Sequence, residues 1–173
     1  AIAAVAQSAG SPVVFEAAES NWGASTFDSV NNKVVIAYSD NVNSNYGTAI
    51  VGTVSGSSIS FGTPVVFQTG YARHISAIFD STNNKIIIAY SNQSSADYGT
   101  AIVGTVSGTS ISFGTAVVYN TGFTYYNSAI FDSTNNKVVI AYEDYANNNY
   151  GTAIVGTVSG TSISFGSEVV FES

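Results

Sequence analysis

The chain has 173 residues, of which 45% are hydrophobic and 13% aromatic, so it has ample material for a buried core. Its net charge is −7 and only 9% of its residues are charged, compared with about a quarter in an ordinary soluble domain. The few basic residues cannot form a basic patch, and Cys is absent. These features exclude nucleic acid as a partner, a disulfide framework and Cys-based catalysis or metal binding.

One stretch of sequence organises the chain. Tyr46–Gly62 (YGTAIVGTVSGSSISFG) returns as Tyr98–Gly114 and Tyr150–Gly166 with one changed position, at a step of 52 residues from 46 to 98 to 150. This periodicity predicts a single repeat domain over residues 13–173, with repeats at approximately 13–64, 65–116 and 117–173. Residues 1–12 are then an N-terminal arm.

The arm begins with an apolar run that is too short to cross a bilayer, so no membrane insertion is expected. It leads into a fourth copy of the Val-Val-Phe segment that recurs in each repeat, which leaves one spare strand. That strand could complete a sheet at a subunit junction or be donated to a neighbouring copy. A frayed end or an edge strand is the alternative for the apolar run. The candidate assembly residues are Ala1, Ile2, Val5, Val13, Val14 and Phe15.

Each repeat predicts four strands. The first is short and ends in an Asp-Ser-x-Asn-Asn turn, in which we expect Asp28, Asp80 and Asp132 to form the turn rather than to act as catalytic carboxylates. The second is an unbroken β-branched run, which indicates a strand covered on both faces. In the first repeat the strands are expected at Ser25–Asp28, Lys33–Tyr38, Gly47–Val54 and Ser58–Phe61, the last extended after a kink by Val65–Phe67.

These patterns predict an all-β protein, because no segment has a helical period. Four short strands per repeat match the blade of a β-propeller. A β-trefoil-like fold is the alternative, although its units would be shorter. Since three blades are too few for a ring, we expect half of a six-bladed ring completed by a second copy, or an open arc.

Two segments differ between the repeats. They are the link into the next repeat (16–24, 68–75 and 120–127) and the connection between the second and third strands (39–45, 91–97 and 143–149). In an up-and-down sheet both emerge at the same end, so one end is variable and the other uniform. Binding residues usually lie on such variable loops. The candidate ligand-binding residues are Trp22, Tyr71, Arg73, His74, Phe123, Tyr125, Tyr126, Asp40, Asp97 and Asp144.

Aromatic rings beside amides and acids suit a glycan or a protein epitope. The alternative is that the rings plug the ends of the core between repeats. Catalysis is not expected: His74 is the only His, no nucleophile motif surrounds any Ser, and a carboxylate pair drawn from Asp40, Asp97, Glu143 and Asp144 has no distinguishing pattern. The acidic and amide side chains lack a calcium-loop spacing, so neither a metal nor a cofactor is expected.

The motifs FDSTNNKVVIAY, YGTAIVGTVSGTSISFG and VVFES resemble a repeat of structural proteins of marine bacteriophages, where it occurs in tandem arrays. The resemblance covers the chain from about Ser11 onward. It implies a virion appendage, tail fibre or surface decoration, extracellular or on a virion surface, with no catalytic residues to carry over. The expected function is therefore a non-enzymatic protein that associates with copies of itself and presents its variable loops to a glycan or protein receptor. A purely structural filament or shell subunit joined by strand donation, and a soluble propeller lectin, are the alternatives.

Overall fold

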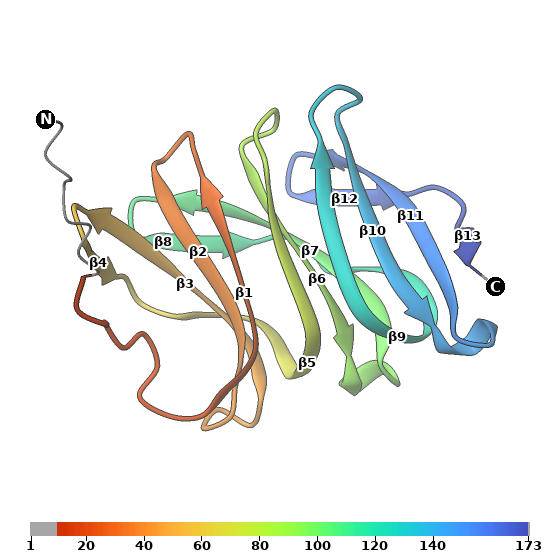
Figure 1. The fold of residues 1–173 in the computed structure, drawn as a ribbon, viewed down its shortest axis with the longest axis horizontal. Helices are drawn as coiled ribbons and strands as arrows, with labels where there is room; N and C mark the ends of the chain where they lie inside the picture. Colours follow the sequence, from red (N-terminus) through yellow and green to blue (C-terminus); the bar gives the residue numbers. More distant parts are fainter. Residues whose placement is uncertain (1–9, 173) are drawn as a thin grey trace, which may run out of the picture.

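A computed structural model describes residues 10–172 of the chain and confirms the all-β prediction (Figure 1). The expectations for Ala1, Ile2 and Val5 lie outside these residues. Within these residues, thirteen antiparallel strands are connected by hydrogen bonds through three successive units, because β5 and β9 each pair in two units. The strands of the first unit are β1 (Ser20–Asp28), β2 (Lys33–Asp40), β3 (Tyr46–Ser55) and β4 (Ser58–Phe61). The second unit has β5 (Val65–Asp80), β6 (Lys85–Asn92), β7 (Tyr98–Ser107) and β8 (Ser110–Phe113). The third has β9 (Val117–Asp132), β10 (Lys137–Asp144), β11 (Tyr150–Ser159), β12 (Ser162–Phe165) and β13 (Val169–Glu172).

Each unit is a four-stranded sheet whose fourth strand is in two pieces. In unit 1, β4 pairs with the second half of β3, and the beginning of β5 pairs with its first half. The break falls at the kink expected between Gly62 and Pro64, where Pro cannot donate a ladder hydrogen bond. After this pairing β5 continues into unit 2 and becomes its first strand, against β6.

The first strand of each unit is longer than the sequence suggests. The sequence predicts a short first strand preceded by a loop in every repeat, but β5 runs unbroken from Val65 to Asp80. The register shifts between Arg73 and Ser76, so a β-bulge absorbs the extra residues without ending the strand. β1 and β9 are extended in the same way, with register shifts beside the corresponding residues. The links at 68–75 and 120–127, and the first link from Ser20 onward, are therefore bulged strands, and the loop assignment for these residues was wrong. Residues 16–19 are not in a strand.

The units pack face to face. Each has a small face, formed in unit 1 by Val35, Ala37, Ala49 and Val51, and a large face, formed in unit 2 by Ile86, Ile88, Tyr90, Ile102, Val106 and Ile111. The small face of unit 1 lies against the large face of unit 2, and the small face of unit 2 lies against the large face of unit 3. Residues 86–90 of β6 are consequently inaccessible on both sides of the sheet. This confirms the two-sided burial that the β-branched run predicts.

The two ends of the units differ as the sequence predicts. The Asp-Asn hairpin turns after β1, β5 and β9 lie together at the top of Figure 1, and the connections after β2, β6 and β10 lie at the opposite end. Asp28 accepts hydrogen bonds from the backbone N–H groups of Val30 and Asn31 and from the Asn31 amide, and the counterparts of Asp28 do the same. The predicted turn role of these acids is confirmed.

Within residues 10–172 the units stand in an open row and the sheet is not closed into a barrel, which is compatible with the predicted all-β repeat fold. No helix within residues 10–172 is long and apolar enough to cross a membrane.

Candidate functional site: an aromatic edge at the variable end

The first-strand bulges place one large ring per unit at the variable end. Trp22, His74 and Tyr126 occupy equivalent positions and share a left-handed backbone, with φ values of 56°, 47° and 52°. Large side chains rarely adopt this conformation, which normally favours Gly or Asn. Such strain persists where surrounding structure imposes it, and it clusters at functional sites. The bulge turns each ring out of the alternating pattern of the strand and toward the edge.

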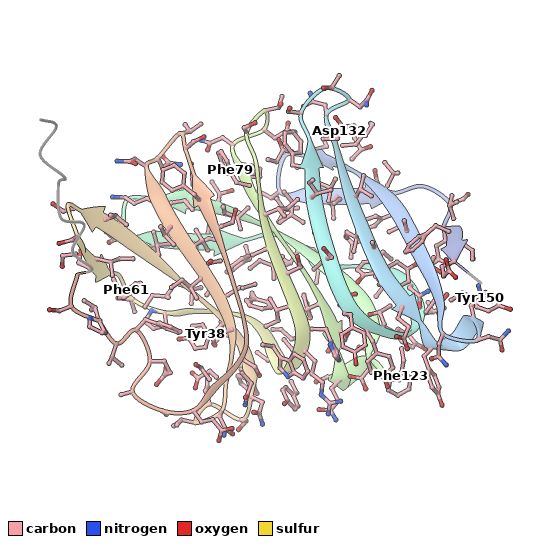
Figure 2. The ribbon with its side chains drawn as sticks, viewed as in Figure 1. Tyr38, Phe61, Phe79, Phe123, Asp132 and Tyr150 are labelled. Carbon is pink, nitrogen blue, oxygen red and sulfur yellow. The ribbon has the colours of Figure 1, made fainter. Side chains whose placement is uncertain are left out.

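The three rings form a ladder across the units. The centroids of Trp22 and His74 are 4.3 Å apart, and those of His74 and Tyr126 are 5.2 Å apart. Tyr125 lies 5.2 Å from His74 in an edge-to-face arrangement. Phe123 extends the row, 6.2 Å from Tyr125 and nearly parallel to it. Figure 2 labels Phe123 at the lower edge of the molecule, far from Asp132 at the uniform end.

Two more tyrosines complete the cluster. The Trp22 indole N–H donates a hydrogen bond to the Tyr71 hydroxyl at 3.4 Å, and Tyr145 packs edge-to-face against both Phe123 and Tyr125. We call this set the aromatic edge: Trp22, Tyr71, His74, Phe123, Tyr125, Tyr126 and Tyr145. Tyr126 is 71% exposed and Trp22 is 40% exposed, and neither belongs to the buried clusters between the units. The rings therefore line the surface above the core rather than fill it.

The one arginine supports the middle of this edge. The Arg73 guanidinium lies 4.6 Å above the Tyr71 ring, and its Nη1 is 3.8 Å from Asp97 Oδ1. At that separation the two charges form an ion pair without a hydrogen bond. Burial lowers the pKa of His74, the neighbouring Arg73 charge lowers it further, and Asp97 opposes them as the smallest influence. His74 is thus neutral at pH 7, with an aromatic face and one N–H to offer.

The three candidate acids lie apart from one another. Asp97 pairs with Arg73 on unit 2, Asp40 accepts a hydrogen bond from the Asn43 backbone in unit 1, and Asp144 caps a short 3-10 turn in unit 3. Asp144 is buried and also accepts a hydrogen bond from the Asn120 amide. Asp97 is linked to the aromatic edge through Arg73, which lies over Tyr71, and Asp144 directly precedes Tyr145. Within residues 10–172, no group of three His, Asp or Glu side chains gathers in a metal-binding arrangement.

A polar hollow of about 440 Å³ lies beside Asp144 on unit 3. The Asn120 amide nitrogen donates to Asp144 Oδ2 at 3.2 Å and to Glu168 Oε1 at 3.0 Å, so one amide joins two carboxylates. Glu168 was not among the sequence candidates, although it replaces Pro64 and Ala116 at the same place in the other repeats. Tyr145 was also missed. Tyr145 lies in the variable connection 143–149, and an aromatic residue in a variable segment is the signal that could have identified it.

Models of protein families give no match to this chain, and neither does a search of curated proteins.

Proposed function

We propose that this chain is a non-enzymatic structural and adhesive repeat protein that associates with copies of itself and binds a receptor through its aromatic edge. The observation that carries the proposal is the strained ladder of Trp22, His74 and Tyr126. Three units hold three different aromatic side chains in the same unfavourable backbone conformation, at the variable end of the molecule. Packing alone does not require this, because Gly or Asn would fit the bulge with less strain.

Among receptors, the edge favours a glycan over a protein. Its rings form a continuous row in which Trp22, Tyr126 and Tyr145 are exposed, and the Tyr hydroxyls and the His74 N–H add polar groups beside them. A row that crosses three units suits an extended ligand rather than a single small pocket. The nearby polar loops supply further hydrogen-bonding groups. Arg73 is already engaged in contacts with Tyr71 and Asp97. A protein epitope, which also favours Tyr, Trp and Arg, is the competing outcome of the test.

An extracellular or virion-surface location follows from the resemblance to phage structural repeats and from the scarcity of charged residues. Two alternatives keep specific support. Exposed apolar faces at both ends of the row favour a structural subunit of a filament or shell. The open row of blades would also suit a soluble lectin, but Trp22, His74 and Tyr126 give the three units unlike sites rather than equivalent ones.

Glycan-array screening tests the proposal. The wild-type chain and a Trp22→Ala/Tyr126→Ala variant are compared with a Val30→Ser variant, which alters an exposed side chain in a turn at the uniform end. We expect wild type and Val30→Ser to bind the same extended glycans and the edge variant to lose at least about tenfold in affinity, since stacked aromatic residues contribute strongly to recognition. Equal binding by all three chains, or binding to protein ligands alone, would reject the glycan-binding edge.

A further inference from the structure

The two ends of the row expose complementary apolar surfaces. Val155 on the small face of unit 3 is 46% exposed, whereas its counterparts Val51 and Val103 are 0% exposed beneath the next unit. The remainder of this face, formed by Val139, Ala141 and Ala153, is partly exposed as well. Nothing in the described part of the chain covers it.

The large face of unit 1 is likewise more exposed than its counterparts on units 2 and 3. Val54 is 51% exposed, whereas its counterparts Val106 and Val158 are each 7% exposed against the preceding unit. Ile59 is likewise more accessible than Ile111 and Ile163. Residues 10–172 therefore contain two buried small-to-large junctions, and among these residues one small face and one large face lie against no other unit.

A segment from outside the three units partly covers the large face of unit 1. Phe15 packs edge-to-face on Tyr38 with centroids 5.2 Å apart, and Phe67 packs on Tyr90 at 5.3 Å. Phe15 also lies 5.9 Å from Phe61. Its neighbour Glu16 accepts a hydrogen bond from the Tyr38 hydroxyl at 3.5 Å, in the place that Gln68 holds beside Tyr90 at 3.2 Å.

The correspondence continues at the start of the segment. Gly10 lies against the Ser57 carbonyl so closely that a Cβ would overlap the oxygen, and Gly62 lies in the same way against Thr109, as does Gly114 against Thr161. Residues 10–16 thus occupy, on unit 1, the place that the fourth strand of a preceding unit occupies on units 2 and 3. They do so without forming a strand of their own.

The fourth equivalent segment begins at Gly166 and lies at the other end of the row of units. Gly166 meets only the Val155 carbonyl oxygen, at 3.8 Å, and Phe171 is 63% exposed. Its strand β13 is nevertheless paired with β11, in a register that includes Thr152 to Val170 and Ala153 to Val169. Phe171 is therefore held in the orientation of Phe67 and Tyr119 but lacks the aromatic residues of a following unit.

We propose that copies of this chain associate head to tail, with the small face of unit 3 on the large face of unit 1 of the next copy, and that Phe15 competes with Phe171 for the position on Tyr38 and Phe61. This deepens the self-association that the proposed function includes. Association displaces residues 10–16, which lack ladder hydrogen bonds, and keeps β13, which has them. The segment acts as a plug that weakens association, rather than as a donated strand.

The same junction extends the aromatic edge. Within the chain, each small-to-large junction places the bulge ring of one unit beside the bulge ring of the next, as for Trp22 with His74 and His74 with Tyr126. A copy added in the same geometry brings its Trp22 beside Tyr126 of the first copy. A shallow hollow of about 280 Å³ lined by Tyr126, Tyr142 and Phe171 lies at that position. The row of rings then continues from copy to copy.

Sedimentation velocity over a wide concentration range tests the interface with three substitutions. Val155→Asp and Val54→Asp each place a carboxylate on one of the two proposed surfaces, and Val42→Asp is the matched control because Val42 is exposed in a loop outside both. We expect the two face variants to remain monomeric and Val42→Asp to associate as the wild type does. The proposed interface would be rejected if all three variants associated to the same extent. It would also be rejected if every chain, including Phe15→Asp, remained monomeric.

Phe15→Asp in the full chain tests the competition. Removing the plug should lower the concentration needed for association by about tenfold, since the half-buried Phe15 side chain no longer has to be displaced. Phe171→Asp should weaken association by a similar factor, and its exposure means that the isolated chain should still fold. Weaker association of Phe15→Asp would instead identify the segment as a connector and reject the competition. Glycan binding is measured separately with the monomeric Val54→Asp chain. If that chain binds glycan, a failure of the association experiments does not reject the receptor-binding proposal.

Discussion

The rings of Trp22 and His74 lie 4.3 Å apart although they belong to different units, and both residues hold a positive φ angle. The contact links the first-strand bulge of unit 1 directly to that of unit 2. It also places the only tryptophan of the chain beside its only histidine. The indole is therefore a natural reporter of the charge on His74 and of any ligand that contacts the aromatic edge.

The first prediction concerns the pH dependence of stability. Because burial and Arg73 lower the pKa of folded His74, the unfolded chain binds more protons at this residue between the folded pKa and about 6.5. The free energy of unfolding should therefore fall as the pH drops below about 6.5. Urea denaturation from pH 7.5 to pH 5 measures this slope, and Trp22 emission against pH gives the pKa in the folded chain.

His74→Phe is the matched variant for this titration, since it keeps a ring in the ladder and removes the ionisable group. Between pH 6.5 and pH 5, the free energy of unfolding of this variant should lack the fall that His74 causes in the wild type. The Trp22 emission of the variant should not change with pH in the same range. A wild-type emission midpoint above pH 6.5 would contradict the proposed environment of His74.

The second prediction concerns backbone strain in the ladder. Tyr126 is largely exposed at a φ of 52°, a conformation that Asn adopts more readily. Tyr126→Asn should raise the free energy of unfolding by about 0.5 kcal/mol, because the relief of strain exceeds the loss of ring contacts. Chemical denaturation measures the change, and glycan affinity should fall in the same variant.

Tyr145→Asn serves as the control for this gain. Tyr145 is an exposed ring of the aromatic edge without a positive φ angle. It should lose a little stability rather than gain any. If Tyr126→Asn were as destabilising as Tyr145→Asn, the left-handed backbone would carry no measurable strain.

The third prediction uses the repeated Asp turn. Asp28 is 1% exposed and accepts three hydrogen bonds, whereas Asp132 makes the same bonds at the solvent-exposed turn of unit 3. Asp28→Ala leaves the part-buried N–H groups of Val30 and Asn31 without their acceptor and should cost about 2 kcal/mol. Asp132→Ala should cost less, because water can replace the carboxylate there. Thermal and urea denaturation measure the free energy of unfolding of both variants. Equal losses in the two would mean that burial of the turn has no effect on the contribution of the Asp side chain.

The fourth prediction separates covered and uncovered copies of one position. Val103 is buried between units 2 and 3, and Val155 is its half-exposed counterpart. Val103→Ala should lower the free energy of unfolding by about 2 kcal/mol through lost burial and a cavity. Val155→Ala should lower it by less than about 0.5 kcal/mol in a monomeric sample. Similar losses in dilute solution would mean that the small face of unit 3 is already covered.

Much of the fold was predictable because the repeat supplies three copies of each signal. The Asp-Asn turns, the β-branched run beginning at Lys85 and the break at Pro64 all act locally, through hydrogen-bonding side chains, side-chain shape and a missing N–H. The variable end could be predicted as well, since it follows from the alternating direction of the strands.

The candidate site was predictable only in part. Sequence comparison aligned Trp22, His74 and Tyr126, but it could not show that a bulge holds them at positive φ, because backbone strain leaves no signature in these residue types. It also treated Phe15 as a spare strand. The place of Phe15 on Tyr38 depends on packing between units, which becomes visible only when equivalent contacts are compared in three dimensions.

The most direct test of the central claim is a proton–nitrogen NMR titration of the monomeric Val54→Asp chain with the best extended glycan from the array. We expect shifts concentrated at the Trp22 indole N–H and at the backbone amides of residues 21–24, 73–76 and 124–127. The turns at residues 29–32 and 81–84 should not change. Shifts centred on those turns, or spread evenly over the three units without the indole, would contradict an adhesive aromatic edge.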